Sequence, residues 1–197
     1  MKKWVVLVVM AGMLAGCSSS GETEETTKSE SVAESTTATK ISSSEQKLEL
    51  KDAAFQIEGT SYNIKVLDRW TIQPEEEDMP FSAREELGLQ GIMVSGRKKL
   101  NAEGFETLKN NLKEQMVSTD DFQIEEESIA EAAYQTVHYA GSEYSFTGNA
   151  EGIKIEYHFY LLETETDYVV INVMGVPSFF EKNGDLVTEM LNSFVAV

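Results

Sequence analysis

Hydrophobic and polar residues alternate along much of the chain, which is the pattern of strands that bury one face. Residues 55–57 and 62–66 both alternate, and the glycine-containing stretch 59–61 between them predicts the turn of a β-hairpin. Residues 153–161 place five apolar side chains at every second position. The pattern therefore predicts a hairpin near the start of the patterned region and a long amphipathic strand later.

Three further apolar runs predict strands of other kinds. Residues 92–94 form a short run flanked by glycines, and residues 134–146 form a longer run that ends at the polar turn 147–152. Residues 168–173 are apolar almost without interruption, which is typical of a central strand covered on both faces.

Two segments change to the three-and-four spacing of an amphipathic helix. The first follows Asn101, whose side chain is suited to cap a helix N-terminus, and its apolar positions are Phe105, Leu108, Leu112 and Met116. The second begins at Pro177 and contains Gly184, which indicates a break. Its apolar face is formed by Leu186, Val187, Met190, Leu191 and Phe194. The order of elements predicts an α+β fold, an antiparallel β-sheet of about six to seven strands with helices packed on it.

The N-terminus has the pattern of an export signal. Two lysines follow Met1, and residues 4–14 are an apolar stretch too short for the roughly 20 residues that span a bilayer. Residues 14–17 (Leu-Ala-Gly-Cys) resemble a bacterial lipobox, which implies that Cys17 carries a diacylglycerol thioether and that residues 1–16 are removed as a lipoprotein signal peptide. The expected location is the extracytoplasmic face of a bacterial cell membrane. An ordinary secretory peptide and an N-terminal membrane anchor are the alternatives.

A low-complexity segment follows the expected cleavage site. Residues 17–47 comprise the lipidated cysteine and a linker dominated by Ser, Thr and Glu, with no aromatic residue. Such a linker has too little apolar surface to offset the entropy of ordering. It predicts a disordered tether with a root-mean-square reach of about 30 Å. Residues 48–197 show no second break in composition and predict one folded domain.

The opening of this domain resembles a known family. Residues 62–70 (Tyr-Asn-Ile-Lys-Val-Leu-Asp-Arg-Trp) are similar to the Mog1/PsbP/DcrB-like fold, in which a Y-x-I-x-V strand leads to a tryptophan, although the usual proline and glycine are missing from the turn. The helix-like residues 105–116, the strand-like residues 168–173 and a Ser-Phe pair near the C-terminus follow in the family's order. The resemblance spans about residues 53–195 and implies a Mog1/PsbP-like domain with a non-catalytic accessory or binding role.

The composition excludes several classes of partner and of chemical site. The chain has 34 acidic and 16 basic side chains and a formal charge of -18, which excludes nucleic acid as an expected partner. Cys17 is the single cysteine, so no disulfide framework and no cysteine zinc site is expected. The acidic runs 75–78 and 125–127 lack the spacing of a folded calcium loop, and we interpret them as solvated charge rather than weak cation sites. No phosphate-binding glycine motif occurs. We therefore expect no cofactor, no metal and no catalytic residue.

His138 and His158 are the two histidines of the chain. Both lie on strand-like segments of one predicted hairpin, so their rings could approach each other. Glu143 or Glu156 could then supply a third metal ligand, but no spacing requires it. Surface or half-buried strand histidines are the simpler interpretation.

Large apolar side chains at an irregular segment are the candidate binding residues. Residues 73–90 combine charge, two prolines and little periodicity, and a loop of this length is often functional. Trp70 before this loop, and Met79 and Phe81 within it, are the candidates, because interfaces are enriched in aromatic residues and methionine. The pair Phe179-Phe180 is a further candidate. For Trp70 and this pair, packing in the core is the alternative interpretation.

Three functions are compatible with these features. The first is a non-catalytic accessory or protein-binding module, attached to the membrane through lipid on Cys17, with an envelope protein as partner. The second is a carrier for a small envelope ligand or lipid, which requires an internal pocket. The third is an enzyme such as a cell-wall hydrolase, which requires titratable groups that converge in a cleft.

Overall fold

A computed structural model describes residues 48–76, 79–117, 123–150 and 152–197. These residues belong to one compact unit, Glu45–Val197. The expected signal peptide and linker, including Cys17, lie outside the described residues. None of the described helices is long and apolar enough to cross a membrane.

The strands form two antiparallel sheets. The small sheet has the order β1-β2-β11, and the large sheet has the order β3-β4-β5-β10-β9-β8-β6, with β7 also paired to β8. The small sheet contains β1 (Leu50–Ile57), β2 (Thr60–Leu67) and β11 (Val195–Ala196). The large sheet contains β3 (Thr71–Ile72), β4 (Phe81–Arg84), β5 (Gly91–Lys98), β6 (Gln123–Ile124), β7 (Ala130–Gln135), β8 (Ala140–Ala150), β9 (Ile153–Glu163) and β10 (Asp167–Gly175).

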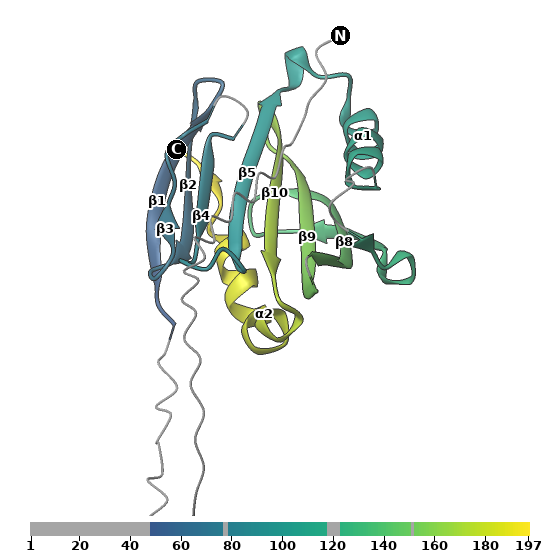
Figure 1. Cartoon of the computed structure of the whole chain (residues 1–197). Coiled ribbons are helices and arrows are strands. Elements are labelled where there is room, and N and C mark those ends of the chain that lie inside the picture. The colour runs from purple at the N-terminus through teal and green to yellow at the C-terminus, as the bar shows by residue number, and fades with distance from the viewer. Residues whose placement is uncertain (1–47, 77–78, 118–122, 151) are drawn as a thin grey trace, which may run out of the picture. The chain divides into compact units, whose positions relative to one another are not determined.

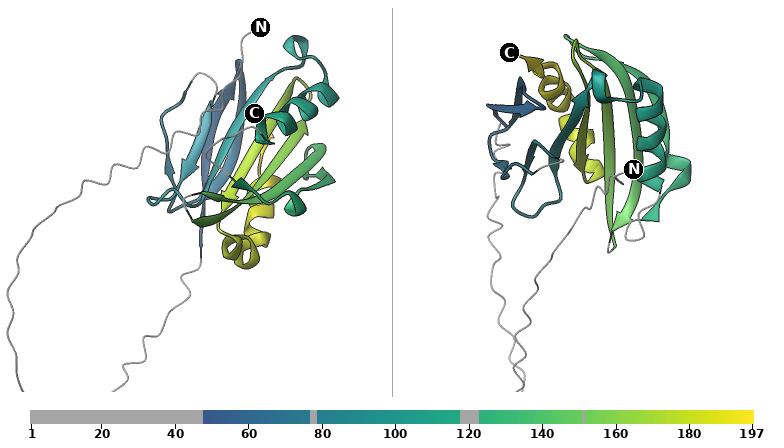
Figure 2. Two further views of the ribbon diagram at one scale, coloured as in Figure 1. Left: turned by 45° about the vertical axis from the view of Figure 1, so that its right-hand side comes forward. Right: turned by 90° about the horizontal axis from the view of Figure 1, so that it is seen from above.

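The elements are arranged in layers on both faces of the large sheet. Helix α1 (Phe105–Val117) covers one face, and helix α2 (Pro177–Asn192) and the small sheet cover the other (Figures 1 and 2). The predicted α+β class is confirmed. The prediction of one sheet is corrected, because β1 and β2 pair with the C-terminal β11 instead of joining the other strands.

The main core lies between the large sheet and the layer formed by the small sheet and α2. Val169, Ile171 and Val173 of β10 are fully buried there. Met174, on the opposite face of β10, belongs to a second apolar cluster that includes Leu112 of α1. β10 pairs with β5 and β9 on its two sides. The prediction of a central strand covered on both faces is therefore confirmed.

A polar network attaches the small sheet to one end of the large sheet. The hydroxyl of Tyr62 in β2 donates to Oδ2 of Asp167 in β10 at 2.7 Å. Burial raises the pKa of Asp167, but hydrogen bonds from Thr166 and Tyr62 outweigh it, and the pKa of Asp167 is lowered overall. In the β1–β2 turn, the carboxylate of Glu58 accepts the backbone N–H of Lys98 at 3.1 Å. The hairpin is thus fixed to the ends of β5 and β10.

Two local predictions are wrong. Residues 134–146 are not one strand, because a turn between β7 and β8 interrupts them. The Oγ1 atom of buried Thr136 makes this turn by accepting the backbone N–H groups of His138 and Tyr139. Asn101 does not cap α1, since its side chain donates to Glu58 and the helix begins after Gly104.

The helical pattern near the C-terminus is confirmed. α2 starts at Pro177, and its residues Val187, Met190 and Leu191 are buried. The backbone is non-helical at Asn183, directly before Gly184. The break indicated by the glycine is therefore present one residue earlier.

Candidate functional site

The candidate binding residues do not form an exposed site. Trp70 has 0% exposure and packs against Phe179 of α2, with 6.1 Å between ring centroids. Phe81 has 3% exposure and stacks on Phe55 at 4.9 Å. Only Met79 is partly accessible. The proposal of Trp70 and Phe81 as partner-facing residues is corrected, because both rings fill the main core.

The segment expected to be a binding loop contains a strand. Residues 81–84 form β4, which pairs with β3 and with β5. Phe81 and Ala83 of β4 point into the core, with exposures of 3% and 0%. The segment is therefore partly a structural element of the sheet rather than one long loop.

A cluster of one histidine and two glutamates lies beside α2. His158 of β9 places Nδ1 2.6 Å from a carboxylate oxygen of Glu143 in β8, and Nε2 2.7 Å from one of Glu156 in β9. The ring also lies against Phe180 of α2, with 4.4 Å between centroids. The sequence had suggested both glutamates as neighbours of a histidine, and the structure brings both to His158. His138 is not part of the cluster, because it lies in the turn between β7 and β8.

The electrostatics of the cluster favour an imidazolium. Two carboxylates, one at each ring nitrogen, require two N–H donors, and only the protonated ring has both. Burial disfavours this charge, but hydrogen bonds with Glu143 and Glu156 outweigh it and raise the pKa of His158. The hydrogen bond with His158 in turn lowers the pKa of Glu143. The cluster therefore joins α2 to β8 and β9 and leaves neither ring nitrogen available to a substrate.

The cluster predicts a pH-dependent contribution to stability. The interaction of His158 stabilises the fold fully below its ordinary pKa of 6.5, and this stabilisation is lost as the pH rises through its raised pKa. The interaction of Glu143 stabilises the fold above its ordinary pKa of 4.5, and this stabilisation is lost as the pH falls through its lowered pKa. We expect His158→Gln to lower the free energy of unfolding by about 1–2 kcal/mol between these values and by less at alkaline pH. Urea unfolding at about pH 5.5 and about pH 9 measures the difference.

The exposed His138 provides the matched control for this prediction. His138→Gln should change stability little at either pH, because the His138 side chain forms no ion pair with any described residue. An equal loss of stability at both pH values for His158→Gln would contradict the ion-pair interpretation.

A shallow groove lies between α1 and the strands beneath it. Residues of α1, β7, β8 and β9 line about 230 Å³ of space, a volume that includes open solvent. Lys109 and Lys113 of α1 both contact the carboxylate of Glu131 across it, and the Lys113 ammonium lies 5.4 Å from the centre of the Tyr144 ring. Lys109, Lys113 and Glu131 of the lining therefore already pair with one another. The cavity volume of the groove is about 10 Å³, far below the roughly 300–1,000 Å³ of typical ligand pockets.

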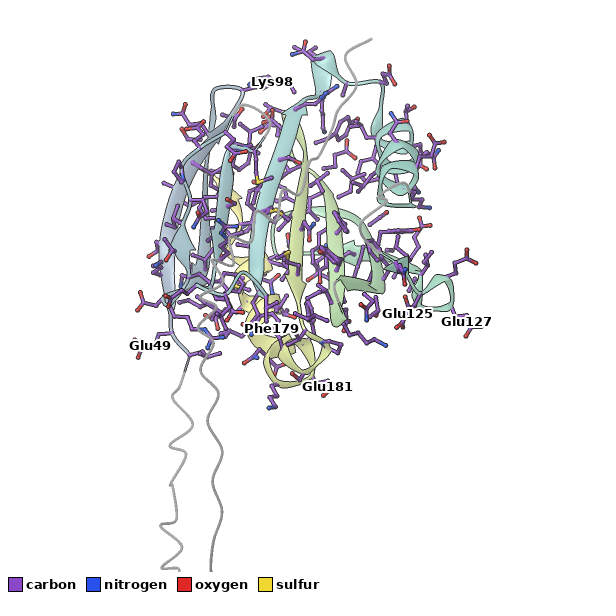
Figure 3. The ribbon with its side chains drawn as sticks, viewed as in Figure 1. Glu49, Lys98, Glu125, Glu127, Phe179 and Glu181 are labelled. Carbon is purple, nitrogen blue, oxygen red and sulfur yellow. The ribbon has the colours of Figure 1, made fainter. Side chains whose placement is uncertain are left out.

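The acidic runs do not form cation sites in the described residues. Glu125 pairs with Lys154 at 2.9 Å, and Glu127 projects into solvent (Figure 3). Of the run 75–78, Glu75 and Glu76 are exposed, and the other two residues lie outside the described residues. No group of three or more His, Cys, Asp or Glu side chains with the geometry of a metal site occurs in the part of the chain that the structure describes.

The sequence interpretation missed one exposed element, the edge strand β7. Its residues Ala130–Gln135 are exposed except for Tyr134. Three alanines in six residues were the available signal, but an alanine-rich stretch predicts neither a strand nor a surface.

Comparison with solved structures identifies the fold. The solution structure of cyanobacterial PsbP (CyanoP) from Synechocystis sp. PCC 6803 matches with a TM-score of 0.53 and 8% identity, over 75% of this chain and 92% of that one. The fold is PsbP-like. At such low identity, this similarity concerns the fold alone.

Two more distant structures match with TM-scores below 0.5 and add nothing to this assignment. LpqN of Mycobacterium tuberculosis, described as involved in cell envelope biogenesis, matches with a TM-score of 0.47 and 10% identity over 76% of this chain and 92% of that one. The Saccharomyces cerevisiae Ran-binding protein Mog1p matches with a TM-score of 0.45 and 12% identity, over 76% of this chain and 96% of that one. No protein-family model and no curated protein sequence matches the chain.

Proposed function

We propose that the protein is a lipid-anchored, non-catalytic binding module on the extracytoplasmic face of a bacterial cell membrane. The observation that supports a binding role best is the closed His158 cluster. Its two ring nitrogens already contact Glu143 and Glu156, so the one half-buried imidazole described is committed to the fold. General acid–base catalysis needs a group that can reach a substrate proton. A surface-binding role fits this arrangement better than hydrolysis.

The groove beneath α1 favours binding at the surface over carriage of a small ligand. A carrier encloses most of its ligand in an apolar cavity. Here the groove has a cavity volume of only about 10 Å³, and Lys109, Lys113 and Glu131 in its lining form ion pairs. A partner protein that docks on the outside does not require such a cavity.

The expected membrane attachment rests on the lipobox-like residues 14–17. Lipid chains contribute about 0.8 kcal/mol per buried methylene, so two or more chains hold a protein stably at a membrane. With its charge of -18, the chain would favour a neutral or basic protein surface over anionic headgroups as partner.

Metabolic labelling with an alkyne analogue of palmitate tests the anchor. We expect the wild-type protein to incorporate the label, to lose residues 1–16 and to sediment with membranes. Cys17→Ala should incorporate no label and keep residues 1–16, because only a thiol can form the thioether. Ser18→Ala is the matched control and should behave as the wild type. Label on the Cys17→Ala protein, or an unlabelled wild type, would refute the lipid anchor.

A further inference from the structure

The outer edge of β7 is an unpaired strand edge. Among the described residues, β7 pairs with β8 on one side and with no strand on the other. β6 pairs with the same side of β8 farther along, so β7 lies at the boundary of the large sheet. Five of the six β7 residues are exposed. An exposed edge of this length is a template for a further strand.

The register shows which backbone groups of β7 face outward. The N–H of Thr136 donates to the carbonyl of Tyr139 at 2.8 Å, so the even-numbered residues of β7 point their backbone groups toward β8. Residues of an antiparallel strand alternate in this respect. The N–H and C=O groups of Glu131, Ala133 and Gln135 therefore face away from the sheet.

β7 lacks the features that normally prevent edge pairing. Such features include very short strands, lysine, proline and charges directed at the edge. The edge strands β3 and β11 have two residues each, and the longer edge strand β1 carries Lys51 and Asp52. β7 has six residues, no lysine and no proline, and its single charge, Glu131, is held over the sheet by Lys109 and Lys113 of α1. The small side chains of Ala130, Ala132 and Ala133 leave the backbone accessible.

The charge next to β7 indicates the chemistry of a partner. Glu126 and Glu127 lie in the short 3-10 turn before β7, are exposed and form no ion pair with the described residues. Glu127 projects away from the domain (Figure 3). A lysine or arginine at one end of an added strand would lie near these carboxylates.

We propose that the outer edge of β7 binds an extended segment of a partner protein as an additional strand, and that this segment carries a basic residue at the end beside Glu126 and Glu127. The backbone groups of Glu131, Ala133 and Gln135 supply the hydrogen bonds. This is strand addition to a sheet edge, in which main-chain bonds give affinity and alternate side chains give specificity. The inference names the binding surface of the proposed function and rests on that function.

A second copy of the chain is a poorer occupant of the same edge. Each chain carries a formal charge of -18, so two copies repel each other. An antiparallel pair of β7 strands would also bring the acidic turns at Glu126 and Glu127 beside a second acidic domain without any cation to compensate them.

Backbone amide exchange with defined peptides tests this proposal. The full chain, labelled with ¹⁵N and held in detergent, is titrated with the peptide Lys-Val-Thr-Val-Thr-Val-Lys to about 1 mM, a concentration that detects weak binding. We expect protection of the amides of Glu131, Ala133 and Gln135, with the even-numbered amides unchanged. Ala133→Pro removes one outward N–H and should weaken binding about tenfold. Ala133→Ser keeps this N–H and should bind as the wild type.

Further probes keep the test decisive if Ala133→Pro does not fold. The same peptide with an N-methyl group on every residue has no backbone donor on either edge and should not protect β7. The peptide Glu-Val-Thr-Val-Thr-Val-Glu should bind more weakly than the lysine peptide. Equal binding of the two would overturn the charge assignment. Absence of protection by the lysine peptide, or protection that rises with protein concentration alone, would overturn the proposed occupant.

This result and the labelling result are independent. Lipid labelling with no protection of β7 would agree with the lipid-anchored binding module and would refute β7 as its binding surface. Protection of β7 in a protein that carries no lipid would support β7 as a binding surface and would refute the lipid anchor.

Discussion

Replacement of Trp70 by alanine is expected to lower the free energy of unfolding by about 3–5 kcal/mol. The indole has 0% exposure in the main core and contacts Phe179 of α2. Its removal would leave a cavity at the point where the end of β2, the large sheet and α2 meet, and little of that cavity can collapse. Urea unfolding of the wild-type protein and of Trp70→Ala measures the change in the free energy of unfolding.

Trp70→Phe is the matched control for this prediction. The indole Nε1 has no hydrogen-bond partner among the described residues, so phenylalanine removes volume without leaving a buried acceptor unpaired. We expect a loss of about 1–2 kcal/mol, smaller than for alanine. A loss below about 1 kcal/mol for Trp70→Ala would contradict the core position and would restore Trp70 as a candidate surface residue.

Replacement of Gly141 by alanine is expected to lower the free energy of unfolding by about 2–4 kcal/mol. A Cβ atom at Gly141 would overlap the carbonyl oxygen of Leu161 and lie 3.0 Å from Cα of Leu162. Both are backbone atoms of β9, so no side-chain rotation relieves the contact and β8 must move away from β9. Urea unfolding with amide exchange measures the change and should show the β7–β8 hairpin losing protection first.

Gly184→Ala tests whether this effect belongs to the site or to the substitution. Apart from its chain neighbours and the nearby backbone of α2, no described residue has an atom within 4 Å of a Cβ built at Gly184. Alanine favours a helix over glycine by up to about 1 kcal/mol, so the variant should be neutral or slightly more stable. If both alanine variants lost the same stability, the steric explanation for Gly141 would be wrong.

The sequence predicted the elements whose periodicity is local. Alternation in residues 62–66 and 153–161 corresponds to β2 and β9, and the apolar run 168–173 corresponds to β10. The helix at Pro177 was likewise recognisable from its apolar spacing. Each of these signals depends only on residues within one element.

The missed elements depend on single side chains or distant partners. The turn at residues 136–139 has no glycine or proline and is made by the hydroxyl of Thr136. β4 has four residues and is defined by pairing with β5. The pairing of β11 with β2 joins the two ends of the domain. Local patterns cannot specify pairing over such separations.

The same distinction applies to the candidate site. Glu156 and His158 are two residues apart on one strand, so their common face follows from the sequence. The approach of Glu143 depends on the register in which Ser145 lies opposite His158. That register follows from a β8 strand that extends to Ala150, whereas the sequence placed a turn over residues 147–152. The exposed edge of β7 was missed because the predicted strand at residues 134–146 includes only the last two residues of β7. The alanine-rich residues before them carry no strand signal.

Cross-linking of the lipidated protein in intact cells, followed by mass spectrometry, tests the proposed binding role most directly. Cys17→Ala, expressed at the same level, is the control. A membrane-anchored accessory module predicts one abundant membrane or secreted partner that is cross-linked to the wild-type protein and lost from the control. The absence of any specific cross-linked protein, in cells where the wild type carries its lipid, would contradict a protein-binding role.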